Sequence, residues 1–456
     1  MKRFVIIVAT IIIAAYGLHG APLVWTGTAA NGLWADVNNW GGSAYPQVGD
    51  TATFNSGTTG TVVFLDAGAI ACDAITVNDA SAAITFNQSV TVGGPFSFTG
   101  SALTLNATLS ATTITIANSG AFSTAAAGDI TATAGGFSQT GAGTNSLAGD
   151  ITTTGNIGFA TGLTLSGPIA LDSGGGTITI ASITGGSQDL TIAAGTAAGT
   201  TTVTGNVTGL GDGTGAALTV ANGVTGLVYF QGTFGGNSGI AAGNAGNSLR
   251  FDGNVTLADG TMATTITTTQ LDGLTWSSYD GASFGALTLS TAAVSLNSNG
   301  GAISAASITG GSQDLTIAAG TAAGTTTVTG NVTSLGDGTG AALTVANGVT
   351  GLVYFQGTFG GNSGIAAGNA GNSLRFDGNV TLADGDTATT ITTTRLDGLT
   401  WSSYDGASFG ALTLSTAAVS LNSNGGAISA ASITGGSQDL TIAAGTAAGT
   451  TTVTVT

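Results

Sequence analysis

The side chains that most enzymes use for acid–base and nucleophilic chemistry are nearly absent from this 456-residue chain. It contains no glutamate, and its only lysine and only histidine, Lys2 and His19, lie close to the N-terminus. Beyond the first 21 residues, therefore, there is no Ser-His-Asp or Cys-His arrangement, no lysine nucleophile and no histidine metal ligand. Aspartate is the one carboxylate left for chemistry, so we expect no enzyme.

Positive charge and cysteine are equally scarce. Beyond residue 21 the only cations are Arg250, Arg375 and Arg395, against 22 aspartates, which gives a net charge of 3 − 22 = −19. Such a surface repels nucleic acid and anionic lipid, so we expect neither as a partner, although the acidity also fits a role in solubility alone. Cys72 is the single cysteine, so stability must come from packing and hydrogen bonding rather than from an intrachain disulfide.

The N-terminus carries an export pattern. Residues 1–21 combine a basic start, an apolar run from Phe4 to Ala15 and small residues near a plausible cleavage point. This pattern is typical of a secretory signal peptide, and the apolar run is too short to span a membrane comfortably. We therefore expect a secreted or cell-surface protein.

A 125-residue unit dominates the rest of the chain. The sequence that begins at Ser182 is repeated from Ser307 and again from Ser432. Residues 182–306 and 307–431 differ at only four positions. The pairs are Gly209/Ser334, Thr261/Asp386, Met262/Thr387 and Gln270/Arg395. The expected domains are a signal peptide (1–21), a Trp-rich N-terminal cap (22–57), degenerate solenoid turns (58–181), repeat 1 (182–306), repeat 2 (307–431) and a truncated repeat 3 (432–456).

Short strand patterns predict an all-β fold. Short segments such as TVVFLD, AITF, LTL and TITI alternate β-branched or aromatic residues with small polar ones, and Gly, Asn, Asp or Ser separates one segment from the next. No complete sandwich or propeller signature is present, and near-identical copies without a linker must continue one another's core. We therefore expect a parallel β-helix, or β-solenoid, with about 20 to 25 residues per turn, five or six turns per repeat and a length on the order of 90 Å.

Three of the five tryptophans lie within residues 25–54: Trp25, Trp34 and Trp40. Aromatic residues gathered at one end of an aromatic-poor chain indicate a cap that covers the first layer of a repeat stack. A platform on which a ligand sugar stacks is the alternative interpretation.

Thr runs such as residues 264–269 do not recur at turn spacing, so we expect no flat array of threonines.

The N-terminal segment resembles a known family. After the W-T-G at residues 25–27, the matching positions are Gly32, Trp34, Asn39, Trp40, Pro46, Gly49, Asp50, Ala52 and Phe54. This arrangement is similar to the N-terminal region of bacterial autotransporter-associated β-strand repeat proteins. The resemblance implies an exported, β-helical passenger that is surface-bound or adhesin-like, with glycans or neighbouring cells as partners.

The aspartates allow two kinds of site. Asp252, Asp259, Asp272 and Asp280 near Arg250 are the candidates for a carbohydrate-active β-helix, either a polysaccharide-binding module or a lyase or hydrolase. Each of these four aspartates precedes a glycine, however, which is typical of turns. Asp212 and Asp337, in the two GDGTG segments, are weak candidates for calcium, the only cofactor we consider.

Two expectations concern particular positions. Asp386 and Arg395 replace neutral residues of repeat 1, and nine residues apart they could pair across one turn of the solenoid. The third copy runs unaltered to Thr454 and ends in a strand-like word without a polar cap. An open solenoid end templates further strands, so we expect either an incomplete gene product or end-to-end self-association.

Overall fold

The described chain folds as a parallel β-solenoid, which confirms the predicted fold class. This computed structural model describes residues 20, 22–57, 59–193, 199–243, 246, 248–318, 324–368, 373–443 and 450–453. The expected signal peptide lies outside these residues, apart from Gly20, and so do residues 454–456 on which the expected open end depends. Within the described ranges, no helix is long and apolar enough to cross a membrane.

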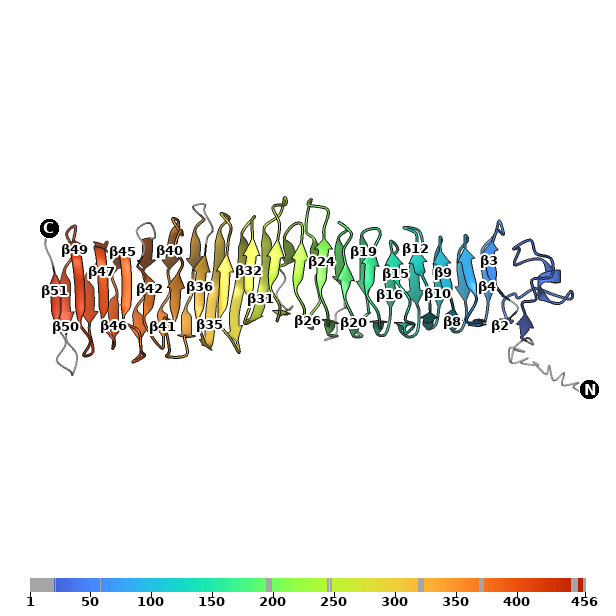
Figure 1. Cartoon of the computed structure of the whole chain (residues 1–456), viewed down its shortest axis with the longest axis horizontal. Coiled ribbons are helices and arrows are strands. Elements are labelled where there is room, and N and C mark those ends of the chain that lie inside the picture. Colours follow the sequence, from blue (N-terminus) through green and yellow to red (C-terminus); the bar gives the residue numbers. More distant parts are fainter. Residues whose placement is uncertain are drawn as a thin grey trace, which may run out of the picture.

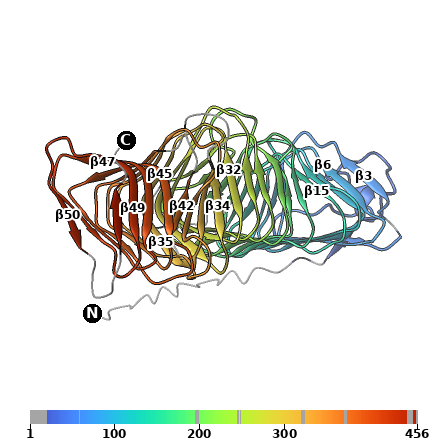
Figure 2. The same cartoon turned by 60° about the vertical axis from the view of Figure 1, so that its left-hand side comes forward.

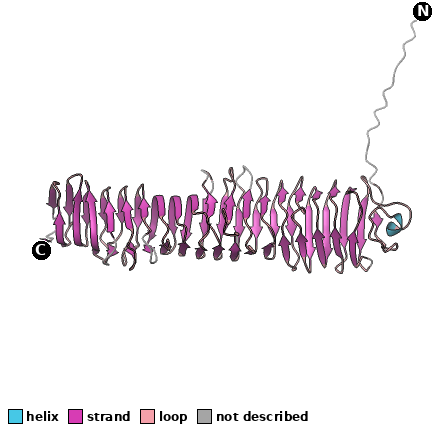
Figure 3. Ribbon diagram, turned by 90° about the horizontal axis from the view of Figure 1, so that it is seen from above, coloured by secondary structure: helices cyan, strands magenta, loops and turns pink. Residues whose placement is uncertain are grey.

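The molecule is a rod with the N-terminal cap at one end and β51 (Thr451–Val453) at the other (Figure 1). About 18 turns stack along its axis, so at roughly 4.8 Å per turn the rod is about 90 Å long, as expected. Figure 3 shows strands throughout the rod, and the short 3-10 helix η1 (Val37–Trp40) lies in the cap. Viewed obliquely, the turns form one continuous coil (Figure 2).

Hydrogen bonding between successive turns produces three faces. The first face contains β1 (Leu23–Val24), β2 (Thr51–Asn55), β5 (Ala74–Asn78), β8 (Phe96–Gly100), β11 (Ile114–Asn118), β14 (Phe137–Gln139), β17 (Ile157–Phe159), β20 (Ile178–Ile180), β23 (Thr201–Val203), β26 (Leu227–Phe230), β29 (Ser248–Phe251), β38 (Val332–Leu335), β41 (Phe359–Gly361), β44 (Val380–Leu382), β46 (Thr400–Ser403), β48 (Val419–Asn422) and β50 (Leu440–Ala443). The second face contains β3 (Thr61–Phe64), β6 (Ala83–Phe86), β9 (Ala102–Leu105), β12 (Phe122–Thr124), β15 (Asn145–Leu147), β18 (Leu163–Leu165), β21 (Ile183–Thr184), β24 (Val207–Leu210), β27 (Phe234–Gly236), β30 (Val255–Leu257), β32 (Thr275–Ser278), β34 (Val294–Asn297), β36 (Leu315–Ala318), β39 (Leu343–Val345), β42 (Ile365–Ala367) and β51.

The third face contains β4 (Ile70–Cys72), β7 (Val90–Val92), β10 (Leu109–Ala111), β13 (Ile130–Ala132), β16 (Ile151–Thr153), β19 (Ile169–Asp172), β22 (Leu190–Ala193), β25 (Leu218–Val220), β28 (Ile240–Ala242), β37 (Thr326–Val328), β40 (Leu352–Phe355) and β43 (Ser373–Phe376). Six longer strands each serve two faces: β31 (Thr264–Asp272), β33 (Ala282–Ser290), β35 (Ile303–Gln313), β45 (Thr389–Asp397), β47 (Ala407–Ser415) and β49 (Ile428–Thr434).

The length of a turn varies more than the sequence suggests. Residues paired between successive turns of the rod are 18 positions apart at Thr264 and Ala282, and 28 apart at Leu190 and Leu218. The long turn contains the GDGTG loop at residues 211–215, whereas the short one passes from face to face within a continuous strand. The range predicted from sequence therefore holds only on average.

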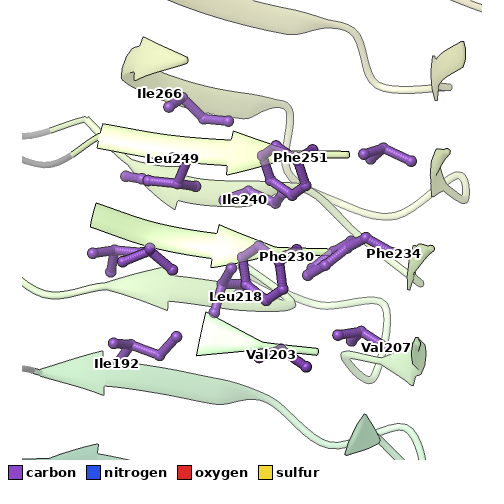
Figure 4. Close-up of a cluster of buried hydrophobic side chains, with 14 of the residues drawn as sticks. Ile192, Val203, Val207, Leu218, Phe230, Phe234, Ile240, Leu249, Phe251 and Ile266 are labelled. Atoms are coloured by element: carbon purple, nitrogen blue, oxygen red, sulfur yellow. The ribbon is translucent and has the colours of Figure 1, made fainter. Parts of the chain in front are cut away.

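The core consists of columns of apolar side chains. In a strand such as β20, the outer two residues point inward and the middle one outward, because side chains alternate along a strand. Parallel in-register pairing then places like residues above one another: Val203 lies next to Phe230, and Phe230 next to Phe251 (Figure 4). The rings of Phe230 and Phe251 stack with centroids 5.2 Å apart. Each turn thus buries its apolar residues against the turns on either side.

Strands β31 and β33 of repeat 1, and β35 at its boundary with repeat 2, turn a corner without a loop. Strand β31 pairs with β28 on the third face and with β29 on the first face. At the corner, Thr267 and Thr268 both point outward, which interrupts the alternation. In β33 the corner residue is Gly285, where an added Cβ atom would lie 2.1 Å from the backbone oxygen of Thr267. The corner therefore requires glycine at this position.

We predict that Gly285→Ala destabilises the turns around β31 and β33 by roughly 1 to 3 kcal/mol, because the methyl group overlaps backbone. The matched control is Gly158→Ala in β17, where no atom lies within 4 Å of an added Cβ atom and no loss of stability is expected. Thermal unfolding followed by circular dichroism, with amide hydrogen exchange of residues 264–290, measures both. Equal behaviour of the two variants would contradict the prediction.

A buried aspartate closes the corner that follows β5. Asp79 accepts hydrogen bonds from the Ser81 hydroxyl (2.7 Å), from the Ser81 N–H (3.0 Å) and from the N–H groups of Gly57 and Thr59 (both 3.2 Å). These donors, the Ser81 hydroxyl foremost, lower the pKa of Asp79 from 3.8 to about 2. The folded state therefore favours the ionised carboxylate.

Because the pKa is lowered on folding, the contribution of Asp79 to stability is complete above its unfolded value of 3.8 and is lost as the pH falls to about 2. We predict that Asp79→Asn lowers the melting temperature at pH 7 and weakens the dependence of melting on pH between about 4 and 2. Melting curves across this pH range test the prediction, with Asp172→Asn as a control. An unchanged pH dependence in Asp79→Asn would contradict it.

Candidate functional site

The three cap tryptophans lie in the interior. Trp25, Trp34 and Trp40 are only 2%, 3% and 3% exposed, and the rings of Trp34 and Trp40 meet edge to face at 4.8 Å. They pack on Phe54 and Phe64 of the first turns. The ring faces are therefore not available to a sugar, and the interpretation of these residues as a stacking platform is wrong. They form the core of the cap.

A cleft of about 500 Å³ lies beside this cap. It runs between residues 34–35 and 45–48 of the cap and residues 66–71 of the first turn. The aromatic side chain of Tyr45 lines it and is only partly buried. Both carboxylate oxygens of Asp66 accept backbone N–H groups, from Trp34 (2.6 Å) and Ala35 (3.0 Å), so this acid holds the cap against the rod.

The two calcium candidates bind their own turns. Oδ1 of Asp212 accepts hydrogen bonds from the Thr214 hydroxyl (2.6 Å) and the Thr214 N–H (2.7 Å), and Asp337 makes the same contacts with Thr339. These hydrogen bonds lower the pKa of Asp212. Among the described residues, no three side chains of His, Cys, Asp or Glu form a group that could hold a metal ion. A calcium site therefore stays a prediction without further support.

The candidate aspartates of repeat 1 separate into two locations. Asp252 and Asp272 meet at Arg250, whose Nε lies 2.7 Å from Asp252 Oδ1 and whose Nη2 lies 3.0 Å from Asp272 Oδ2. Asp280 instead accepts a hydrogen bond from the Gly260 N–H at 2.9 Å. Only Arg250, Asp252 and Asp272 of the proposed set therefore form a cluster.

Tyr229, which the sequence analysis did not identify, completes this cluster. Its hydroxyl donates a hydrogen bond to Asp252 Oδ2, and the guanidinium carbon of Arg250 lies 4.8 Å from the centre of its ring. The hydrogen bond to Asp252 raises the pKa of Tyr229, and the same carboxylate raises the pKa of Arg250. Tyr229, Arg250, Asp252 and Asp272 form what we call the repeat-1 patch. The sequence signals only that Tyr229 and Arg250 are the polar residues that alternate with apolar ones in their strands; the pairing of β26 with β29 places them side by side.

Repeat 2 contains the same arrangement. Tyr354, Arg375, Asp377 and Asp397 form the repeat-2 patch, in which Arg375 lies 2.7 Å from Asp377 and 3.2 Å from Asp397. In each patch, two aspartates form ion pairs with one arginine. The charge of each arginine is therefore neutralised by its own aspartates. The side chains are 12% to 28% exposed, so water and ligands can still reach them.

The expected pair between Asp386 and Arg395 is wrong. Asp386 accepts the N–H of Gly340 at 2.6 Å, just as Thr261 accepts the N–H of Gly215 at 2.9 Å in repeat 1. Arg395 donates to the Ser415 hydroxyl and lies next to Arg375 in the sheet. The two substitutions therefore act independently, at different places on the turn.

Outward hydroxyl side chains of both threonine and serine recur at turn spacing in one column of the first face, which Gly158 interrupts. This mixed column is not the flat array of threonines that the sequence analysis argued against. On the first face the outward positions pair in register in the order Thr53, Thr76, Ser97, Thr115, Ser138, Gly158, Thr179 and Thr202. The column then continues into Tyr229 and Arg250. Each residue of this column lies in a different strand, so the column cannot be recognised from consecutive threonines in the sequence. The patch therefore lies within a longer surface of hydroxyl groups.

We predict that Arg250→Gln destabilises its turns by about 1 kcal/mol, because two carboxylates lose a partly buried partner. Repeat 2 offers a matched control: Arg395→Gln restores the residue found in repeat 1 and should change stability by less than about 0.5 kcal/mol. Amide hydrogen exchange of β26, β29 and β31, at low and high salt, measures the first effect. A loss in Arg395→Gln as large as that in Arg250→Gln would contradict the prediction.

Comparison of the chain with models of protein families, with curated proteins and with solved structures finds no match. Any functional conclusion therefore depends on the residues and contacts of this chain itself.

Proposed function

We propose that this chain is a non-catalytic, exported β-solenoid protein that acts outside the cell as a structural or adhesin-like surface protein. The observation that carries the proposal is the internal pairing of its partly buried charged clusters. In both patches the arginine and the aspartates bind one another, so they make a rigid surface rather than a reactive centre. The leader pattern and the resemblance to autotransporter-associated repeat proteins support export and a surface role.

The residue types available support a binding role over a catalytic one. A general acid and base for glycoside cleavage need two carboxyl groups in different environments, one of them holding a proton near neutral pH. Asp252 and Asp272 instead share one arginine and accept hydrogen bonds from Tyr229 and Thr291. The two carboxylates therefore lie in one shared ion-pair cluster rather than in two contrasting environments.

A second candidate function is a carbohydrate-active β-helix. The cleft of about 500 Å³ beside Tyr45 favours its binding form, because ligand sites are commonly concave and partly aromatic. Such a polysaccharide-binding module is compatible with a non-catalytic surface role, whereas a lyase or hydrolase would replace that role with a catalytic one.

Incubation of the purified protein with acidic and neutral polysaccharides separates these possibilities. We expect no release of reducing ends or unsaturated products, together with adhesion of protein-coated beads to cells or glycan-coated surfaces. Turnover by the protein that disappears in Asp252→Asn or Asp272→Asn would overturn the non-catalytic proposal. The matched control for these variants is Asp259→Asn, since Asp259 lies outside the patch.

A further inference from the structure

The two patches lie on different sides of the rod. Tyr229 and Arg250 pair between β26 and β29 on the first face, whereas the equivalent Tyr354 and Arg375 pair between β40 and β43 on the third face. The same displacement holds for the corner strands: β31 joins the third face to the first, but its equivalent β45 joins the second to the third. Repeat 2 is therefore rotated about the rod axis by one face relative to repeat 1.

The number of strands in a repeat explains this rotation. From β26 to β39 the chain forms 14 strands, of which three serve two faces, so one repeat occupies 14 + 3 = 17 positions. A solenoid with three faces returns to the same face only after a multiple of three positions. Because 17 is one short of 18, every further copy begins one face earlier. The repeat thus spans between five and six turns, as predicted, but not a whole number of them.

The chemistry of the patches indicates the kind of ligand. In the sheet, Thr202 and Gln270 flank the repeat-1 patch, so hydroxyl and amide groups surround an arginine stacked on a tyrosine. In the repeat-1 patch the arginine is already neutralised by two aspartates, so a polyanion finds no free cation there. In repeat 2 the exposed Arg395 occupies the position of Gln270 and lies beside Arg375. The whole chain carries a net charge of −17, which also repels polyanions. Carboxylate and amide groups beside an aromatic ring suit the hydroxyl groups of an uncharged sugar.

We propose that each patch binds a neutral, hydroxyl-rich glycan and that the rotation between repeats makes the rod a bridge between glycans on two sides. This inference rests on the proposed surface role. Two sites that face different directions cannot both engage one straight polysaccharide chain, and avidity is lost when geometry forbids simultaneous binding. The rod therefore cross-links separate glycan strands or surfaces.

The binding experiment uses beads coated with dextran or with mannan, and alginate beads as the polyanionic control. The site-1 variant combines Tyr229→Thr with Arg250→Thr, and the site-2 variant combines Tyr354→Thr with Arg375→Thr. Threonine is the residue at the neighbouring outward positions Thr202 and Thr327, so the variants keep the surface pattern of the rod. Circular dichroism and melting curves confirm that each variant is folded.

We expect the intact chain to agglutinate dextran or mannan beads but not alginate beads. Each single-site variant should bind about half as much soluble glycan with an affinity within about twofold of the intact chain, and should not agglutinate beads. The variant that lacks both sites should not bind. Agglutination by a single-site variant equal to that of the intact chain, or full binding without both sites, would overturn the proposal.

Labelling tests the rotation without any ligand. Tyr279 and Tyr404 are equivalent positions, 50% and 48% exposed, that follow β32 on the second face and β46 on the first face. Gold clusters attached to Tyr279→Cys and Tyr404→Cys should project from different sides of the rod in electron micrographs. The native Cys72 stays unlabelled because it is buried, and burial raises its pKa to about 12. Labels on one side in all views would refute the rotation.

The outcomes also separate this inference from the proposed function. Adhesion to cells without binding to dextran, mannan or another uncharged glycan would overturn the bridging inference and leave the surface role intact. Glycan turnover that depends on Asp252 would overturn the proposed function itself.

Discussion

In-register hydrogen bonding between successive parallel turns is the constraint on which this structure depends. Each turn is too small to bury its apolar residues alone, so it is stable only when the turns above and below cover it. Parallel pairing fixes which residues meet, as when Val203, Phe230 and Phe251 form one inward column. The same register lines up the outward residues, so core and surface follow from one set of contacts. A shift by one residue would exchange the two sides.

The end of such a stack has no neighbouring turn to cover its apolar residues, so another structure must cover them. At the N-terminus, Trp25, Trp34 and Trp40 supply a core that is far more aromatic than that of the turns. The indole N–H of Trp34 donates to the Pro46 carbonyl (3.0 Å), and that of Trp40 donates to the Trp34 carbonyl (2.7 Å). The large rings thus cover the first layer; the indole N–H groups of Trp34 and Trp40 have acceptors, whereas that of Trp25 is buried without one among the described residues. This explains why aromatic residues concentrate at this end.

The corners of the turns determine which face of the rod the equivalent residues of each repeat occupy. Where strands such as β31 and β33 bend without a loop, the chain spends fewer residues per turn, and Gly285 allows the close approach of the two backbones. Where the GDGTG loop intervenes, a turn is longer. A duplicated sequence therefore need not return to the same face. Two nearly identical surfaces, built around Arg250 and Arg375, point in different directions as a result.

The sequence alone determined the fold class, the repeat and the exclusion of most catalytic residues, because alternation, duplication and composition are local properties. It also placed Asp252 and Asp272 near Arg250. It did not identify Tyr229 or the hydroxyl columns, since their members are joined only by pairing between turns of unequal length. Nor did it show that the tryptophan rings are buried or that Asp386 and Arg395 have separate partners. Those features depend on which turn lies beside which, and only the tertiary structure, through its corners and loops, sets that register.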